Sequence, residues 1–279
     1  MPPTRFKNSS HIRVGVLLAP PPVQLLDLAP VDLFFMLSKE YIGDIPMLPS
    51  PVKKLAIDKL DIFYISDEHD SAVQSFAADS KDRCQLVPTT AKLNIRLTAN
   101  LSTPEVQPGE LTVLIVPGPD PASTLSQAYE DFLQQHACSG KTDIITVCTG
   151  IYPACNSGIC DGKTVTGPRG LLSDLESKFK NVKTFEDHRW SRDILPAGKG
   201  AKSSGDRSAE LWTSAGITNG NDVIAAYLKD HFDPELAQIV CRMADVGDRP
   251  RTYDTGQVSE NMWWVSRILK AAIKGLWKI

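Results

Sequence analysis

Several features that define large classes of protein are missing from this sequence. Six cysteines among 279 residues are too few for a disulfide-stapled scaffold, and none of them forms a C-x-x-C pair. The polar N-terminal residues MPPTRFKNSSHIR contain no signal-peptide core. The first apolar run, residues 14–18, is too short to span a membrane and is soon followed by three prolines. We therefore expect a cytoplasmic protein without a membrane partner.

An excess of charge of one sign is also missing. The 30 Lys and Arg residues nearly balance the 33 Asp and Glu residues, which gives a formal net charge of -3 at pH 7. No bulk positive field exists to hold nucleic acid, so we expect no nucleic-acid partner. Hydrophobic residues make up 42% of the chain, and single cores stop growing at roughly 250–300 residues. The length therefore predicts one large domain, or one domain with an appendage.

The order of apolar and amphipathic segments predicts an α/β fold. Short apolar runs that suit buried strands alternate with stretches of helical periodicity, and tight turns join them. This rhythm is typical of parallel strands with crossover helices on both faces, which is a doubly wound sheet. Expected strands span residues 14–18, 61–66, 93–101, 111–116, 143–147, 164–166 and 211–215, and expected helices span residues 27–38, 125–137, 150–157, 171–179 and 221–232.

Residues 233–279 are expected to form a helical extension of a core built by residues 1–232. The second of its two expected helices, residues 259–277, carries an apolar stripe beside several lysines. Such a helix can lie on a membrane, but an apolar stripe more often packs on its own domain or on a partner subunit, which we expect here. The Gly/Ser/Lys-rich segment 192–209 lacks the spacing of a phosphate loop and is expected to be a surface loop.

The most informative stretch is IITVCTG, residues 144–150, in which Cys148 ends an expected buried strand. Gly150 permits a sharp turn into the next helix, which lifts the sulfur to the carboxyl edge of the sheet, where open α/β sheets bind ligands. The helix N-terminus there favours a thiolate. Cysteine is also commonly buried for packing alone, so the spacing by itself leaves both a catalytic and a packing role open.

Two further loops are expected to meet Cys148 at the same edge. Asp27 stands at the start of the helix after the first strand, and Gly118 lies in the turn PGPDP that follows the strand at 111–116. The Asp27 carboxyl can act on the thiol or can simply cap its helix. The Gly118 amide can donate to a developing negative oxygen, or the turn can be rigid without further function.

With these residues in place, the chain resembles the DJ-1/PfpI superfamily, and within it the branch of the isonitrile hydratases. The resemblance implies a flavodoxin-like α/β sandwich with a mainly parallel sheet, assembled as a homodimer, that needs no metal and no organic cofactor. The matching segments are QLLDLAPVDLF, LIVPGPDP, ITVCTG, GKTVTG and LWTSAGITNGNDVIAAYL, which run from about residue 14 to residue 228.

The same resemblance implies roles for individual residues. Cys148 corresponds to the reactive thiol, and Asp27 corresponds to the acid that isonitrile hydratases place beside it. The backbone amides of Gly118 and Thr149 correspond to an oxyanion-binding pair. The Thr149 hydroxyl corresponds to a group that contacts the substrate.

Two positions depart from the family pattern. Pro119 stands where relatives commonly have a second glycine, and because proline has no N–H the oxyanion site is expected to have fewer donors. Pro168 stands where many relatives have a histidine, so a cysteine–histidine protease or an amidotransferase would lack its base. Arg169 beside it either meets an anionic substrate or is a solvent-facing charge.

Together with the resemblance, these residues favour a cofactor-independent cysteine enzyme that adds water to a small carbon electrophile. For an isonitrile, Cys148 attacks the terminal carbon, Asp27 protonates it, and water cleaves the thioimidate to a formamide. A glyoxalase III-like conversion of 2-oxoaldehydes is a second hypothesis, which the missing histidine weakens. A third is a non-enzymatic, redox-sensing or chaperone-like dimer in which Cys148 oxidises. A transcriptional regulator is disfavoured, because no helix-turn-helix pattern follows the core.

Overall fold

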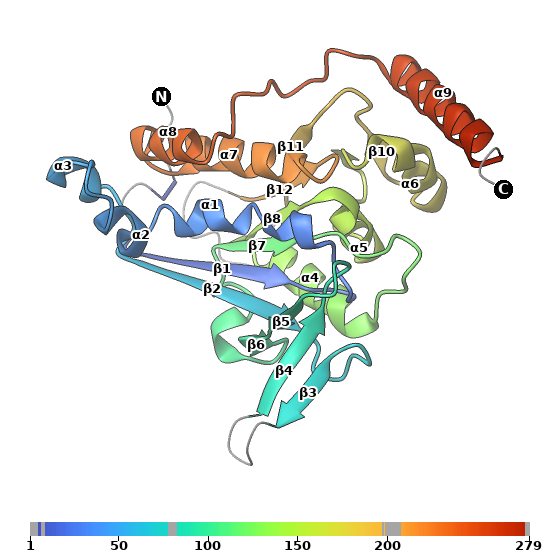
Figure 1. Ribbon diagram of the computed structural model, residues 1–279. Helices are drawn as coiled ribbons and strands as arrows, with labels where there is room; N and C mark the ends of the chain where they lie inside the picture. Colours follow the sequence, from blue (N-terminus) through green and yellow to red (C-terminus); the bar gives the residue numbers. More distant parts are fainter. Residues whose placement is uncertain (1–4, 7–8, 78–82, 197, 199–207, 277–279) are drawn as a thin grey trace.

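A computed structural model describes residues 5–6, 9–77, 83–196, 198 and 208–276 of the chain. The strands of its central sheet are β1 (His11–Leu17), β2 (Lys59–Ser66), β6 (Ala99–Asn100), β7 (Val113–Val116), β8 (Asp143–Thr146), β11 (Trp190–Leu195) and β12 (Ala209–Ser214). Their spatial order is β11-β12-β8-β7-β1-β2-β6 (Figure 1). All neighbours are parallel except β11, which runs antiparallel to β12 at one edge.

Helices cover both faces of this sheet. One face carries α1 (Val31–Phe35) and α7 (Asn219–His231), and the other carries α4 (Gln127–Cys138), α5 (Ile151–Asn156) and α6 (Leu172–Lys178). Successive strand side chains point to opposite faces, so Val16 and Ile145 join the first core, whereas Leu17 and Ile144 join the second. The doubly wound, mainly parallel α/β fold predicted from the sequence is confirmed.

Smaller elements surround the sheet. A three-stranded antiparallel sheet projects from one side of the molecule, and a two-stranded parallel sheet lies beside α6 (Figure 1). The three-stranded sheet consists of β3 (Gln74–Ala77), β4 (Arg83–Pro88) and β5 (Asn94–Arg96). The two-stranded sheet consists of β9 (Thr164–Val165) and β10 (Lys183–Thr184). Two short helices, α2 (Lys39–Gly43) and α3 (Ser50–Lys53), lie between β1 and β2 in the sequence.

Three expected elements differ from those observed. The helix expected over 27–38 is interrupted at Pro30, which has no N–H to donate, and splits into a 3-10 turn and α1. The strand expected over 93–101 crosses from β5 to β6, because Thr98 pairs with Tyr64 of the central sheet. The strand expected over 164–166 pairs with β10 outside the central sheet, since β11 already occupies the edge beside β12.

Most of the loop expected over 192–209 lies outside the described residues, and its first part belongs to β11.

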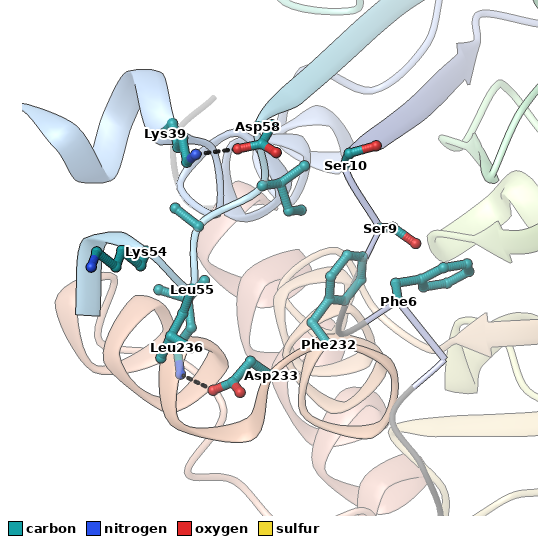
Figure 2. Close-up of a pocket in the computed structure, with 12 residues that line it drawn as sticks. Phe6, Ser9, Ser10, Lys39, Lys54, Leu55, Asp58, Phe232, Asp233 and Leu236 are labelled. Atoms are coloured by element: carbon teal, nitrogen blue, oxygen red, sulfur yellow. Dashed lines mark hydrogen bonds and ion pairs between the residues drawn. The ribbon is translucent and has the colours of Figure 1, made fainter. Parts of the chain in front are cut away.

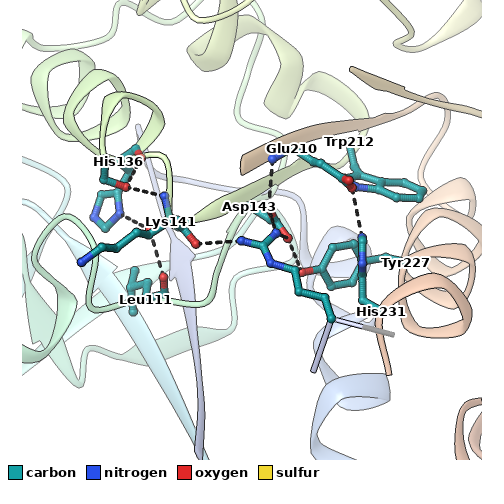
Figure 3. A network of polar contacts seen from close by, with 11 residues as sticks. Leu111, His136, Lys141, Asp143, Glu210, Trp212, Tyr227 and His231 are labelled. Atoms are coloured by element: carbon teal, nitrogen blue, oxygen red, sulfur yellow. Dashed lines mark hydrogen bonds and ion pairs between the residues drawn. The ribbon is translucent and has the colours of Figure 1, made fainter. Parts of the chain in front are cut away.

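A buried polar network joins the amino ends of β8 and β12 (Figure 3). The Asp143 carboxylate accepts two hydrogen bonds of 2.6 Å from Arg5 and one of 2.7 Å from the Tyr227 hydroxyl. The carboxylate of Glu210, in the neighbouring strand, accepts from the Trp212 indole over 2.8 Å and lies 3.0 Å from His231 Nε2. The network ties the N-terminal segment and α7 to the sheet, at the edge opposite the carboxyl ends of the strands.

The C-terminal helices differ in how they pack. The apolar side chains of α8 (Pro234–Met243) join the core beside α7. In contrast, α9 (Gln257–Leu276) projects away from the body and exposes its apolar side chains (Figure 1). Within the described ranges, no helix combines the length and the apolar character that crossing a bilayer requires.

Candidate active site

Cys148 stands where β8 turns into α5. A single turn of 3-10 helix, η3 (Cys148–Gly150), makes the connection, and Cys148 has a φ of 55°, a left-handed conformation that costs energy for a residue with a side chain. Gly150 has no space for a side chain, because a Cβ there would overlap the carbonyl oxygen of Val116 at the end of β7. This geometry is that of a nucleophile elbow, and it leaves Cys148 half-buried at the carboxyl edge of the sheet.

Asp27 reaches the same edge from η1 (Leu25–Leu28), the 3-10 turn that follows β1. Its side chain is fully buried, and its Oδ2 accepts a hydrogen bond of 2.9 Å from the Gly118 amide. Its Oδ1 is buried without a hydrogen-bond partner among the residues that the structure describes. Burial raises the pKa of Asp27 to about 7, although the hydrogen bond from Gly118 lowers it. Near neutral pH the carboxyl is therefore poised between its two protonation states.

Gly118 is the point at which the three loops meet. A Cβ added there would lie 2.6 Å from Asp27 Oδ2 and 2.9 Å from the Thr149 amide nitrogen, and it would overlap the Thr149 hydroxyl. That hydroxyl donates a hydrogen bond of 2.7 Å to the carbonyl of Pro119. The structure therefore brings Asp27, Gly118, Thr149 and Cys148 together, and the absence of a side chain at Gly118 allows them to meet.

The thiol of Cys148 is less acidic than its place at a helix N-terminus predicts. Burial, and next the negative charge of Asp27, raise its pKa to about 12, whereas the amide and hydroxyl of Thr149 lower it. Burial and the Asp27 charge therefore oppose the thiolate that the helix N-terminus favours. An ionised sulfur beside an ionised carboxylate is unfavourable, so a charge on Asp27 opposes ionisation of Cys148.

Arg169 contacts a different part of the chain. Its guanidinium donates to the Thr255 carbonyl over 2.8 Å and to Gln257 Oε1 over 3.1 Å, and it stacks on the Tyr253 ring at 4.5 Å. These contacts anchor the segment that leads into α9. Among the described residues none of its hydrogen bonds or ion pairs reaches Cys148, so its role in substrate binding stays a prediction.

Contacts that no sequence pattern predicts hold the Asp27 loop in place. The Gln24 amide donates to the Gly118 carbonyl over 2.8 Å, and Val23 forms β-bridges with both Thr89 and Pro119. Thr89 belongs to the turn between β4 and β5, so the small antiparallel sheet braces the loop that carries Asp27. The prolines before Val23 predict a turn at this point, but no local pattern predicts that residue 89 lies against it.

Histidine takes part in other contacts. The side chains of four histidines lie within hydrogen-bond distance of groups elsewhere in the fold: His11 of Asp61, His136 of Thr142 and Val106, His188 of Asp187, and His231 of Glu210. The described part of the chain places no group of three or more His, Cys, Asp or Glu side chains where they could hold a metal ion.

A pocket of about 290 Å³ lies elsewhere, at the amino edge of the sheet (Figure 2). Ser9 and Ser10, which precede β1, line it together with Asp58, which precedes β2, and with Phe232. None of the predicted site residues lines this pocket. The chemistry predicted from the sequence therefore belongs to the opposite edge of the sheet.

Comparison with known proteins identifies the fold. No family model matches the chain, and no curated protein matches it. Among solved structures, it is similar to DJ-1beta of Drosophila melanogaster, with 14% identity, a TM-score of 0.57, and coverage of 85% of this chain and 98% of that one. It is also similar to a ThiJ/PfpI family protein from Pseudomonas syringae, with 18% identity, a TM-score of 0.56, and coverage of 97% and 90%.

A third similar structure is an AraC family transcriptional regulator from Pseudomonas putida, with 11% identity, a TM-score of 0.54, and coverage of 84% of this chain and 99% of that one. At these identities the likeness concerns the fold, and proteins of different function share it. It agrees with the mainly parallel sheet and the helices on both faces described above. The chain therefore has the fold of the DJ-1/PfpI superfamily.

Proposed function

We propose that this protein is a DJ-1/PfpI superfamily member that acts as a cofactor-independent cysteine enzyme, adding water to a small carbon electrophile, with isonitriles as the first substrate class. The observation that carries the proposal is the fully buried Asp27 carboxyl, which meets the Cys148 elbow at Gly118 and titrates near neutral pH. A buried acid with a pKa near the working pH can both accept and donate a proton. The substrate is a small molecule, and the proposal includes a cytoplasmic location and the homodimer that the family resemblance implies.

The proposed reaction begins with the proton of the Cys148 thiol. The Cys148 thiol passes its proton to Asp27 as the sulfur attacks the terminal carbon of the isonitrile. Asp27 returns that proton to the same carbon, so a thioimidate forms and the carboxylate is restored. Water then adds to the thioimidate carbon, the nitrogen takes a proton, and the C–S bond breaks to release an N-substituted formamide and the thiol. One water is consumed and no electrons are transferred, so no redox cofactor is needed.

The hydrogen bonds at Gly118 favour this chemistry over acyl transfer. Acyl-transfer enzymes stabilise an oxyanion with two amide donors. Here the Gly118 amide donates to Asp27, and Pro119 has no N–H, which leaves the Thr149 amide for a substrate oxygen. Attack on an isonitrile places developing negative charge on carbon, where a proton donor is needed. In this proposal the Gly118 amide therefore positions Asp27, and Thr149 contacts the substrate.

Conversion of an aryl isonitrile to its formamide, followed by liquid chromatography, tests the proposal. We expect turnover by the wild-type protein and a loss of at least about 1,000-fold in Cys148→Ala and in Asp27→Asn, because each removes an essential group. Cys138→Ala, which changes an exposed cysteine, is the matched control and should retain activity. Turnover of methylglyoxal without formamide would support the glyoxalase III-like reaction instead. Addition of two oxygens to Cys148 by mild peroxide, without either turnover, would support a redox role.

A further inference from the structure

The apolar face of α9 lies open in the monomer. Nearly all of α9 is exposed, and six apolar residues on one side of it form what we call the α9 stripe: Val258, Met262, Val265, Leu269, Ala272 and Ile273. The five larger side chains are each more than half exposed. Contacts of Arg169 with Gln257 and Glu260 hold the start of α9, and the rest of the helix projects outward (Figure 1). A continuous apolar surface of this kind marks a site of association.

The spacing of the stripe is that of a two-helix seam. Val258, Met262, Val265, Leu269 and Ala272 follow one another at intervals of four, three, four and three residues. This is the a/d pattern of a heptad repeat, which keeps one narrow row of side chains facing a partner helix. The row contains Val and Ala, which are small enough for the close approach of two helices.

The charges of α9 favour a helix partner over a lipid surface. Helical geometry places Arg267 and Lys274 on the face opposite the stripe, where they do not meet a second stripe. Helices that lie on membranes place tryptophan in the apolar face. In α9, Trp263 and Trp264 both lie outside the stripe: the Arg267 guanidinium stacks on the Trp263 ring at 5.3 Å, and the Trp264 indole donates to Glu260 over 3.0 Å. The stripe itself carries no charge and no aromatic ring.

We propose that α9 pairs with α9 of a second copy of this chain, as an antiparallel coiled coil. In that orientation the large Met262 packs against Ala272 of the partner subunit, and Leu269 packs against the partner's Val265. A parallel pair would instead set Met262 against its own counterpart and leave a thin layer of two alanines. The antiparallel pair is a closed, two-fold symmetric contact, because the same surface is used on both copies.

The area available is sufficient for such a contact. The five larger stripe side chains each leave on the order of 100 Å² open, so complete burial of two stripes would remove roughly 1,000 Å² from solvent, about the minimum for a specific protein interface. The proposal concerns assembly alone and does not depend on the chemistry of Cys148.

Disulfide trapping in the full-length protein tests both the contact and its direction. In a Cys138→Ser background, mixed Met262→Cys and Ala272→Cys proteins should form a cross-linked dimer under mild oxidation, in higher yield than either protein alone, because a disulfide requires Cα atoms within about 7 Å. Adding Leu269→Glu should abolish the cross-link. Arg267→Glu, on the opposite face, is the matched control and should retain it.

Three outcomes would overturn the proposal. One is a cross-link yield no higher than that of the background protein. Another is preferential cross-linking of Met262→Cys to itself, which would indicate a parallel pair. The third is flotation of the wild-type protein with phosphatidylserine vesicles that Leu269→Glu prevents, which would assign the stripe to a lipid surface. Circular dichroism of each variant should match the wild type, since Leu269 and Arg267 lie outside the core.

Discussion

At the scale of residues, the proposed chemistry depends on one proton, which passes from the Cys148 thiol to the Asp27 carboxylate. Asp27 is buried with its Oδ1 unpaired among the described residues, while its Oδ2 accepts from Gly118. Burial and the Asp27 charge also raise the pKa of the Cys148 thiol. Neither group reacts alone in our account: Asp27 must be ionised to take the thiol proton, and must hold that proton to give it to the substrate carbon.

This coupling predicts the pH dependence of the reaction. Below the Asp27 pKa of about 7, both groups are protonated and the carboxyl cannot accept the thiol proton. We therefore expect kcat/KM for an aryl isonitrile to rise as the pH increases through about 7 and then to level off. A pH profile from 5 to 9 measures this, and a rate that falls as pH rises through 7 would contradict it.

The same burial has a consequence for stability. The folded-state pKa of Asp27 is raised from 3.8 to about 7, so folding favours the protonated form. Its stabilising contribution is complete below about pH 4 and is lost as pH rises through 7, a change of at most about 4 kcal/mol. Asp27→Asn removes this titration, so the variant should gain stability relative to the wild type between pH 5 and pH 8. Urea unfolding at both pH values measures the difference, and a relative loss at pH 8 would count against the burial.

At the scale of elements, the elbow depends on close packing between the start of α5 and the end of β7. The sequence predicted this turn because Gly150 follows a buried strand by a fixed offset, and the structure explains the glycine by the nearness of the Val116 carbonyl. Asp27 could be predicted for a similar reason, since it follows another strand end. The bracing contact between Val23 and Thr89 could not, because it joins segments that lack a shared pattern.

Replacing the elbow glycine tests this packing. Gly150→Ala places a methyl group on the Val116 carbonyl oxygen, so we expect a loss of about 3 kcal/mol in the free energy of unfolding, with loss of activity. Gly170→Ala is the matched control, because nothing lies within 4 Å of its added Cβ, and its effect should stay within about 0.5 kcal/mol. Equal urea midpoints for the two variants would show that the elbow is not close-packed.

At the scale of the whole molecule, the amino edge of the sheet holds a buried polar network, and the carboxyl edge holds the proposed active site. The amino ends of β8 and β12 hold the buried network of Asp143 and Glu210 (Figure 3). The carboxyl end of β8 leads to Cys148. The alternation of strands and helices was enough to predict the parallel sheet. The place of β11 at its edge was missed, because Trp190–Leu195 mixes polar and apolar residues without a clear period and pairs through residues distant in sequence.

Substitution of Arg5 tests whether the buried polar network at the amino edge stabilises the fold. Arg5→Ala leaves the buried Asp143 carboxylate without its ion-pair partner, so we expect a loss of about 3 kcal/mol in the free energy of unfolding. Arg192→Ala breaks an exposed pair with Asp230 and should cost less than about 1 kcal/mol. Urea unfolding compares the two, and a loss in Arg5→Ala as small as that in the control would contradict a stabilising role for the network.

Mass spectrometry of a trapped covalent intermediate tests the central claim most directly. The protein is mixed with an aryl isonitrile, quenched within the first turnovers and digested. Our account predicts that the peptide containing Cys148 gains the full mass of the isonitrile, since the S–H bond adds across its terminal carbon, and that Asp27→Asn forms this adduct far more slowly. Formamide production with no adduct on Cys148, or with an adduct that forms equally fast in Asp27→Asn, would contradict it.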